Sequence, residues 1–489
     1  MVNPVAGYAS GLDAAIVAAT REEIMPGTMF DKIWDRHVIA DLGEGWSLLY
    51  LDRILVHDLS GGRAMAELAE AGRHVAEPRK VFATPDHAVS TEPGRTAASY
   101  PKGERLLKSL RERCAAEGVR LFDLGEKGNG IVHVIAPELA IVLPGLTLAC
   151  GDSHTCTNGG VGAMAFGIGA SELAHALATQ TLPQRRPGTF RIRFEGARPP
   201  GVTAKDMILA AIGRFGAAAG TGMAMEYAGE AVRALSMEER LTLCNLSIEM
   251  GAKVGMVAPD ETTFAYLAGR EFAPTGAAWD TALRDWRALP SDAGARFTRD
   301  EVIRIEDIAP QITWGTSPEQ VAAVTGHVPH LADAPDAARR AAWEAALDYM
   351  GLQPGQRLIG TRVDWVFIGS CTNSRLSDLR AAADVLQGRH KAPHVTAWVV
   401  PGSEAVKMEA EAEGLHLRFQ EAGFEWREPG CALCVAANGE AVPDGARCVS
   451  TSNRNFVGRQ GTGARTHLAS PAMAAAAALA GAIVDVRGF

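Results

Sequence analysis

Three cysteines in two short segments place the strongest constraint on how this 489-residue chain can fold. Cys371 lies in Val366–Arg375 (VFIGSCTNSR), and Cys431 and Cys434 lie in Pro429–Cys434 (PGCALC). Three thiolates are one short of a closed structural zinc site. An iron–sulfur cluster held by only three thiolates leaves one iron with an open position, which can act as a Lewis acid on a substrate oxygen. The pattern therefore suggests addition or removal of water.

The residues alone also allow different roles for these cysteines. Paired cysteines can bind zinc, form a redox pair or lie unreactive in a core. The nearest fourth zinc ligand is Cys448, which lies in a short β-like run (Arg447–Thr451) and is expected to face a core. A three-cysteine cluster, a zinc site and inert thiols are thus all compatible with the spacing.

The composition limits the class of protein. A chain of this length with 47% hydrophobic residues can bury a large core, and length alone suggests about three domains. A net charge of −9 argues against nucleic acid or an anionic membrane as partner. Eight cysteines without disulfide-like spacing suit a reducing compartment, and we expect a cytoplasmic protein. The Ala-rich stretch 471–482 is too short to span a bilayer and predicts a buried helix.

Apolar runs alternate with helical patterns along most of the chain, which predicts an α/β fold. We expect four parts: an N-terminal extension (1–27), a first α/β domain (28–188), a second α/β domain with a connecting segment (189–320) and a third α/β domain (321–489). Within these, residues 270–350 are rich in Pro, Ala and charge, and predict surface excursions and a connection.

Polar residues follow several of the expected strands. Cys371 comes just after the apolar run 365–368, and the carboxyl ends of strands in open α/β sheets are where ligands bind. Asn373 or Ser374 is expected to cap a helix that begins near Arg375.

The strand expected at 146–150 leads into Asp152, Ser153 and His154, and then into a glycine-rich run with a helix cap expected at Ser171. The pair Gly167-x-Gly169 lacks the third glycine of a dinucleotide fingerprint. A carboxylate, a hydroxyl and an imidazole at one strand end favour a small diacid instead.

Further acid–base and anion-binding candidates appear elsewhere. Asp86 and His87 form a second acid–imidazole pair, and His133 lies in a third expected strand. Such histidines are compatible with a proton-transfer network and equally with ordinary core positions. Arg454 and Arg459 lie five residues apart in a glycine-containing loop, where they could bind carboxylates or simply be solvated.

In combination these segments resemble the aconitase superfamily from about residue 28 onward, and most closely its isopropylmalate dehydratase large subunits. The matching segments are GDSHT (151–155) with FGIG (166–169), LTLCN (241–245), MGAK (250–253), VAPDET (257–262), GSCTNSR (369–375), PGCALC (429–434), STSNRNF (450–456) and THLASPAM (466–473).

The resemblance implies three aconitase-like α/β domains around one [4Fe–4S] cluster per subunit, without the swivelling fourth domain. Its ligands would be Cys371, Cys431 and Cys434. His87 with Asp86, His133, and His154 with Asp152 would orient and protonate the departing hydroxyl, and Glu226 would bind water at the cluster. The implied substrate-binding residues are His57, Ser153, Asn373, Asn453, Arg454 and Arg459.

The base that removes the carbon-bound proton in this superfamily is a serine in a Gly-Ser-Ser-Arg motif, and the sequence contains no such motif. We therefore expect a small partner subunit that supplies this serine, and a small dicarboxylate substrate. The implied activity is a hydro-lyase of leucine biosynthesis that moves a hydroxyl group between neighbouring carbons.

Two positions differ from the leucine-pathway pattern: Ala88 stands where asparagine is usual, and 217–219 are alanines where a Ser/Gly-rich turn is expected. They leave room for a paralogue that acts on dimethylmalate, citramalate or homocitrate. A cluster-free RNA-binding relative is a different alternative, against which the acidic balance and the intact cysteine set both argue. An electron-transfer role is disfavoured because three ligands leave one iron exposed.

Overall fold

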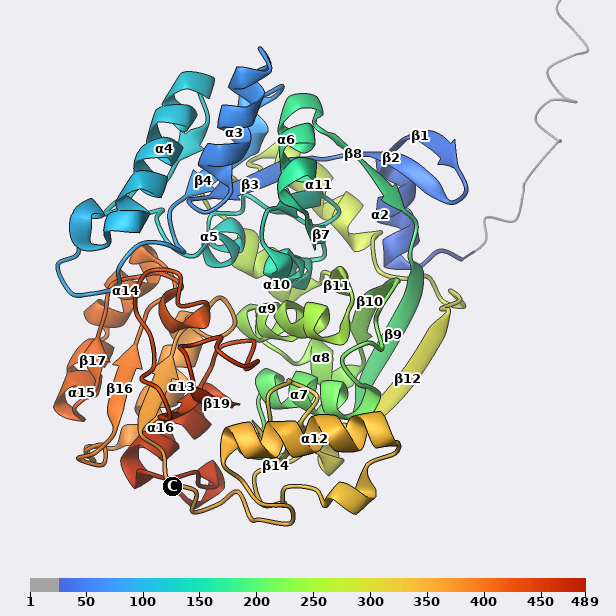
Figure 1. Cartoon of the computed structure of the whole chain (residues 1–489). Coiled ribbons are helices and arrows are strands. Elements are labelled where there is room, and N and C mark those ends of the chain that lie inside the picture. The colour runs from blue at the N-terminus through green and yellow to red at the C-terminus, as the bar shows by residue number, and fades with distance from the viewer. Residues whose placement is uncertain (1–25) are drawn as a thin grey trace, which may run out of the picture.

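The computed structural model describes residues 26–489, so residues 1–25 of the expected N-terminal extension lie outside the described part. Three mainly parallel sheets follow one another along the chain, coloured blue to teal, green to yellow, and orange to red in Figure 1. Two small antiparallel sheets accompany them. The expected α/β class is confirmed.

The first parallel sheet has the strand order β5-β4-β3-β6-β7. Its strands are β3 (Arg53–His57), β4 (Val81–Thr84), β5 (Arg120–Leu121), β6 (Thr147–Cys150) and β7 (Met164–Gly167). The central strands are short apolar runs buried on both faces, as parallel sheets require. The chain order reverses between β3 and β6, which creates a switch point where strand ends leave room for a ligand.

Helices and a small sheet accompany this first block. Helices α3 (Gly61–Glu70), α4 (Pro101–Glu117), α5 (Val132–Glu138) and α6 (Ala170–Thr179) connect the strands. Helix α2 (Met29–His37) precedes an antiparallel sheet of β1 (Val38–Gly43), β2 (Trp46–Tyr50) and β8 (Thr181–Arg185). Between β6 and β7 runs a 3₁₀ segment, η3 (Ser153–Val161).

The second sheet has the order β11-β10-β9-β12, with all neighbours parallel. Its strands are β9 (Gly188–Glu195), β10 (Met223–Ala228), β11 (Val254–Val257) and β12 (Arg299–Arg304). Helices α7 (Ala204–Phe215), α8 (Glu230–Arg233), α9 (Met237–Asn245) and α10 (Glu261–Leu267) belong to this block, and η4 (Leu246–Met250) follows α9.

The expectation that residues 270–350 form surface excursions was wrong in part. This stretch contains α11 (Ala277–Arg287), the sheet strand β12, the hairpin of β13 (Gln311–Thr313) and β14 (Val321–Ala323), and α12 (Ala337–Met350). Strand β12 pairs with β9, and Ile303 on β12 and Ile305 just after it enter the core of the second block. The many charged residues in this stretch masked the few buried positions in the sequence pattern.

The third sheet has the order β17-β16-β15-β18-β19 and a second switch point between β15 and β18. Its strands are β15 (Trp365–Ile368), β16 (Thr396–Val399), β17 (Glu425–Trp426), β18 (Arg447–Ser450) and β19 (Arg465–Leu468). Helices α13 (Leu376–Leu386), α14 (Glu404–Ala412), α15 (Leu415–Glu421) and α16 (Pro471–Ala480) complete it, with η7 (Ala432–Cys434) after β17.

The Ala-rich helix α16 is buried, as expected, because small side chains let it pack closely against α13 and β15. Cys448 lies on β18 and is fully buried, as its β-like run predicted. No helix within residues 26–489 is both long enough and apolar enough to cross a membrane.

Three local predictions were wrong. His133 lies in helix α5, where the Asp86 carboxylate accepts the Val132 N–H at 2.9 Å near the helix start. A four-residue apolar run does not by itself distinguish a strand from a buried helix. Helix α6 starts at Ala170, after Gly169, so Ser171 lies inside the helix and does not cap it. Helix α13 is capped by the Asp378 carboxylate, which accepts the Arg375 N–H, and not by Asn373 or Ser374.

Candidate active site

Adjacent strands of the first sheet deliver acid and imidazole groups to one edge. His57 is the last residue of β3, Asp86 and His87 follow β4, and Asp152 follows β6. Strand β3 pairs with both β4 and β6 in parallel, so these strand ends lie side by side. The switch point of the first sheet therefore gathers the polar residues that the sequence suggested.

Asp152 is the centre of this group. Its carboxylate accepts hydrogen bonds from His87 Nε2 at 3.1 Å and His133 Nε2 at 3.2 Å, and from the backbone N–H of His154 at 2.6 Å. Burial alone would raise the pKa of Asp152, but the hydrogen bonds from His133, His154 and His87 hold it well below its usual value. The carboxylate is thus a fixed negative charge among three imidazoles.

The His133 ring is fixed from both sides. Asn158 Nδ2 lies 3.3 Å from His133 Nδ1, which therefore accepts, so His133 Nε2 carries the proton that it donates to Asp152. The helical placement of His133 directs its ring toward the same carboxylate that His87 contacts. The sequence anticipated this convergence, although it assigned His133 to the wrong kind of element.

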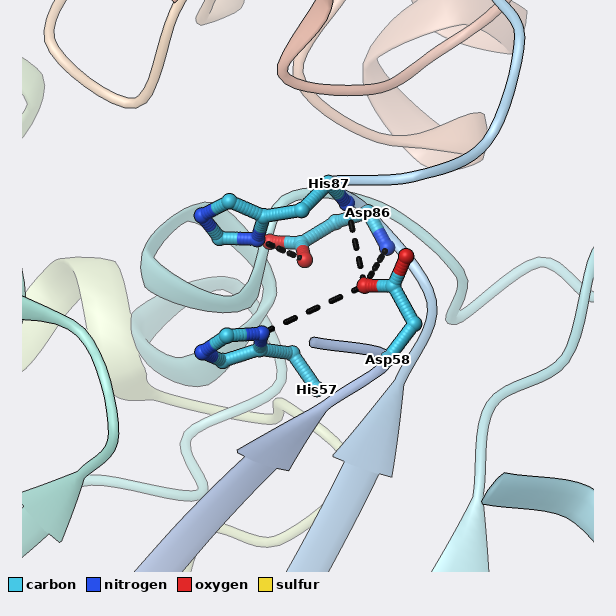
Figure 2. A group of neighbouring side chains, drawn as sticks. All are labelled: His57, Asp58, Asp86 and His87. Atoms are coloured by element: carbon cyan, nitrogen blue, oxygen red, sulfur yellow. Dashed lines mark hydrogen bonds and ion pairs between the residues drawn. The ribbon is translucent and has the colours of Figure 1, made fainter. Parts of the chain in front are cut away.

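His57 and His87 lie face to face at the end of β3, with ring centroids 4.3 Å apart and planes at 26° (Figure 2). Burial alone would lower the pKa of His87, but the negative charges of Asp86, Cys431 and Asp152 raise it well above its usual value. Burial and the neighbouring charge of His87 lower the pKa of His57. The stack therefore pairs a protonated His87 with a neutral His57.

Asp58 holds the segment that carries the Asp86–His87 pair. Its carboxylate accepts the backbone N–H groups of Asp86 at 3.2 Å, His87 at 3.1 Å and Ala88 at 2.5 Å (Figure 2). Asp86 Oδ1 in turn accepts from His87 Nδ1 at 2.5 Å, and Asp86 Oδ2 accepts from Val132 N.

The ligand atoms of His57, Asp58, Asp86 and His87 lie within 4.8 Å of one another, close enough to suit a metal ion. The contacts above already occupy both carboxylates, however. We therefore interpret this group as a hydrogen-bonded cluster and not as a metal site.

Three buried cysteines lie at the facing edge of the third sheet. Cys371 follows β15, and Cys431 and Cys434 border η7. Polar hydrogens point at two of these sulfurs: Asn245 Nδ2 lies 3.2 Å and Asn453 Nδ2 3.4 Å from Cys371 Sγ, and Ser370 Oγ lies 3.1 Å from Cys434 Sγ. Donors of this kind stabilise negatively charged sulfur, as thiolate ligands require. The Cys431 Sγ instead lies 3.7 Å from Asp86 Oδ2.

The three sulfurs are not all as close together as ligands of one zinc ion. Two sulfurs on one zinc ion, each at about 2.3 Å, cannot be more than about 4.6 Å apart. Within residues 26–489, the His–Asp cluster is the group whose ligand atoms all lie within 4.8 Å of one another. The three cysteine sulfurs do not all lie that close together. Cys448 pairs along β18 and faces the core. The donor set therefore fits a multi-iron cluster better than zinc.

Backbone and side-chain hydrogen bonds join the two edges. The Cys431 N–H donates to the Asp86 carbonyl oxygen at 2.8 Å, and the Arg95 guanidinium donates to the Pro429 carbonyl oxygen. Glu440 accepts from Thr91 N at 2.6 Å and from Arg427 at 3.1 Å. The cysteine loop is thus fastened directly to the segment that carries His87.

Glu249 is a site residue that the sequence analysis missed. Its Oε1 accepts from His154 Nε2 at 2.9 Å and from Arg454 Nε at 2.7 Å, and it is buried. It lies in η4, in the stretch between the LTLCN and MGAK segments. Nothing in the local sequence distinguishes this glutamate, because its partners His154 and Arg454 lie far away along the chain.

Glu226 is not part of this group. It lies on β10 and its Oε2 accepts from Ser291 Oγ at 2.6 Å, while Arg191 and Lys32 supply the nearest positive charges. Burial raises its pKa. The prediction for Glu226 was wrong because β10 directs this side chain toward the segment before β12, on another side of the second sheet from η4.

Asn373 is also directed away from the sulfurs. Its amide donates to Asp378 at 2.9 Å and to Thr242 at 3.3 Å, and its oxygen accepts from Lys205. Protein groups therefore occupy both of its donor hydrogens and its oxygen accepts from Lys205, so the structure does not support its predicted role in substrate binding. Asn453, in contrast, touches both Cys371 and Cys434.

The remaining predicted residues border the group. Ser153 Oγ lies 3.5 Å from His154 Nδ1 and is partly exposed. Arg454 has a side chain 23% exposed, so it can contact both Glu249 and a ligand. Arg459 lies with its guanidinium 5.4 Å from the Phe456 ring centroid, and its Nε is buried without a hydrogen-bond partner in the described residues.

Comparisons with known proteins identify the family of this chain. The family model described as "Aconitase family (aconitate hydratase)" matches residues 31–481. The chain is 62% identical over 460 residues to "3-isopropylmalate dehydratase large subunit 1" of Bradyrhizobium diazoefficiens, which covers 94% of this chain and 96% of that protein. The crystal structure of Thermococcus kodakaraensis aconitase X (holo-form) aligns with a TM-score of 0.45 and 13% identity, over 83% of this chain and 84% of that one. With its Asp–His pairs and its three cysteines at facing sheet edges, this chain belongs to the aconitase family.

Proposed function

We propose that this chain is the large subunit of a hydro-lyase that isomerises 2-isopropylmalate to 3-isopropylmalate through 2-isopropylmaleate, in leucine biosynthesis. The observation that carries the proposal is the 62% identity to a 3-isopropylmalate dehydratase large subunit over nearly the whole of both chains. The Asp152-centred group and the three-cysteine edge support it. The same identity favours isopropylmalate over dimethylmalate, citramalate and homocitrate.

Membership of the aconitase family implies an iron–sulfur cluster. We propose a [4Fe–4S] cluster held by Cys371, Cys431 and Cys434. Their buried sulfurs, the amide donors at Cys371 and a spacing beyond that of single-ion ligands fit it. When bound, such a cluster supplies an open iron that draws electron density from a substrate hydroxyl and carboxylate. Burial raises the pKa of Cys371 and Cys431, so cluster binding must displace protons from both thiols.

The histidines around Asp152 are placed to move the proton that a departing hydroxyl needs. His87 is the protonated member of the stack, and its Nε2 lies against Asp152, so it can donate a proton and recover it when water returns. Asp86 and Asp152 keep the His87 ring oriented through the chemical step. His133 and His154 hold Asp152 from the other side.

Glu249 and Arg454 form the other wall of the site. The Glu249 carboxylate holds both the His154 ring and the Arg454 guanidinium, so it fixes an acid–base group and an anion-binding group together. Arg454 has free donors on the exposed side for a substrate carboxylate. Ser153, His57, Asn453 and Arg459 are the further proposed substrate contacts.

The complete reaction needs a second polypeptide. Dehydration removes a carbon-bound proton together with the hydroxyl, which leaves a carbon–carbon double bond and water; rehydration at the neighbouring carbon restores both. The described site offers groups for the hydroxyl, and the sequence lacks the Gly-Ser-Ser-Arg motif that would supply the carbon base. We therefore propose a small partner subunit that carries the base, as the phrase "large subunit" in the relative's name suggests.

Anaerobic turnover tests this function. The chain is reconstituted with iron and sulfide, mixed with its small subunit and assayed for 2-isopropylmalate dehydration. Turnover should require the partner and disappear in Cys431→Ser, while Cys114→Ser, a buried cysteine on α4, should retain it.

If the cluster is intact but 2-isopropylmalate is not turned over, the result would favour dimethylmalate, citramalate or homocitrate as the substrate. RNA binding by the cluster-free chain would favour the non-enzymatic alternative.

A further inference from the structure

Lys205 is a buried ammonium group next to the cysteine edge. It is the second residue of α7 and is fully buried. Its Nζ donates to the carbonyl oxygens of Ser452 at 2.6 Å and Thr451 at 2.9 Å, and to Asn373 Oδ1 at 3.4 Å. All three acceptors are uncharged. Among residues 26–489, no carboxylate oxygen lies within 4.0 Å of Nζ.

A buried charge without a counter-charge is costly, so its retention needs an explanation. The nearest acids are already in use. Asp206 accepts from Thr203 and from Gln311 N, and Asp378 accepts from Asn373 and caps α13 through the Arg375 N–H. Burial lowers the pKa of Lys205 to about 7, and the negative groups that oppose this are led by Asp378, Cys434 and Cys371. Two of the three cluster cysteines are therefore among the groups that favour a charged Lys205.

The carbonyl groups that Lys205 holds lead directly into the cluster site. Thr451 and Ser452 precede Asn453, whose amide lies 3.4 Å from Cys371 Sγ and 3.5 Å from Cys434 Sγ. The next residue is Arg454, which contacts Glu249. One ammonium group thus fixes the backbone from which both a sulfur-contacting amide and an anion-binding guanidinium project.

We infer that Lys205 is the protein's built-in counter-charge for the iron–sulfur cluster and the positioning residue of the Asn453–Arg454 loop. This inference rests on the cluster assignment proposed above. Three thiolates and a [4Fe–4S] core carry net negative charge, and a fixed ammonium behind two of the sulfurs offsets it. In the cluster-free chain the same ammonium lacks its partner. The cluster-loaded protein should therefore depend on Lys205 far more than the cluster-free protein does.

The test compares Lys205→Met, Lys205→Arg and wild-type protein in cluster-loaded and cluster-free forms. The matched control is Lys102→Met, an exposed lysine on α4. Loaded Lys205→Met should lose its cluster in air about tenfold faster and show a lower cluster reduction potential, because a nearby positive charge has gone. Its thermal midpoint should fall in the loaded form and change little in the cluster-free form. Lys205→Arg should keep the wild-type potential.

Two results would overturn the inference. One is an equal loss of thermal stability in both forms with an unchanged reduction potential, which would show that Lys205 only supports the loop. The other is cluster-free Lys205→Met that fails to fold. The iron content, sulfide content and turnover of the wild-type protein are measured first. Uptake of the cluster without isopropylmalate turnover would contradict the proposed substrate and leave the Lys205 test unaffected, whereas absence of uptake would contradict both.

Discussion

At the scale of single residues, one carboxylate distinguishes the sequence-based site from the structural one. Glu249 joins His154 to Arg454, while Glu226 is bonded to Ser291 elsewhere. Replacement of Glu249 by Gln should lower kcat by about 10² or more, the usual effect of losing an oriented acid–base group. Replacement of Glu226 by Gln should leave kcat near wild type. Steady-state assays of both variants at equal cluster content provide the measurement, and the reverse ranking would restore the sequence-based assignment.

Most other residues of the group could be predicted because their types are uncommon together. Cysteines in a Cys-x-x-Cys pattern and Asp–His pairs after apolar runs are few in any chain, so their combination suggests chemistry. Glutamates are common in any chain, and the local sequence does not show on which side of a sheet a glutamate will lie. Asp58 was missed for a related reason, since its partners are backbone N–H groups that have no signature in the sequence.

At the scale of elements, close backbone contact between η3 and β11 predicts a sensitive glycine. A Cβ on Gly159 would lie 1.8 Å from the Gly255 carbonyl oxygen, so the two segments would have to separate. Gly159→Ala should destabilise the protein by about 3 kcal/mol or more. Gly27→Ala is the control, because a Cβ there meets no atom closer than 3.7 Å. Denaturant unfolding of both variants measures the difference, and equal midpoints would contradict the packing described for η3.

Strand β19 carries a histidine that should make stability depend on pH. His467 donates through Nδ1 to the Thr313 carbonyl oxygen and accepts from Arg447 through Nε2. Burial and the charge of Arg447 lower its pKa from 6.5 to about 3. Below pH 6.5 His467 therefore binds a proton in the unfolded chain but not in the folded chain. The free energy of unfolding falls as the pH drops below about 6.5, by up to about 1.4 kcal/mol per pH unit.

The control for this pH dependence is His467→Gln, which cannot titrate. Between pH 7.5 and 5.5 the thermal midpoint of the wild type should fall more than that of the variant, both measured anaerobically with the cluster loaded. Parallel pH profiles would mean that His467 is not neutral in the folded protein.

Strand and helix limits were predicted best where the pattern was long, and worst where a few residues decided it. The apolar run before Cys371 and the Ala-rich α16 appeared as expected. The helix that contains His133 was not predicted. Its start depends on the Asp86 side chain, 46 residues away, which accepts the Val132 N–H. Long-range contacts of this kind are absent from any local pattern.

At the scale of the whole molecule, the site depends on how the first and third blocks are joined. Glu440 connects Thr91 with Arg427, close to the Cys431–Asp86 contact. Glu440→Ala would leave the buried Arg427 and the Thr91 N–H without this acceptor, at a cost of about 3 kcal/mol. Hydrogen exchange should become faster in both 86–91 and 427–434 and remain unchanged in the second sheet. Faster exchange in only one of the two segments would show that they are not coupled.

The separation of the cysteines along the chain has a consequence for biosynthesis. Cys431 leaves the ribosome about 60 residues after Cys371, several seconds later at typical rates of translation. Asp86 and Asn245, which contact the cysteine residues, emerge long before either cysteine. With the proposed ligand set, the cluster can therefore be completed only after Cys434 has emerged and the third block has folded against the first.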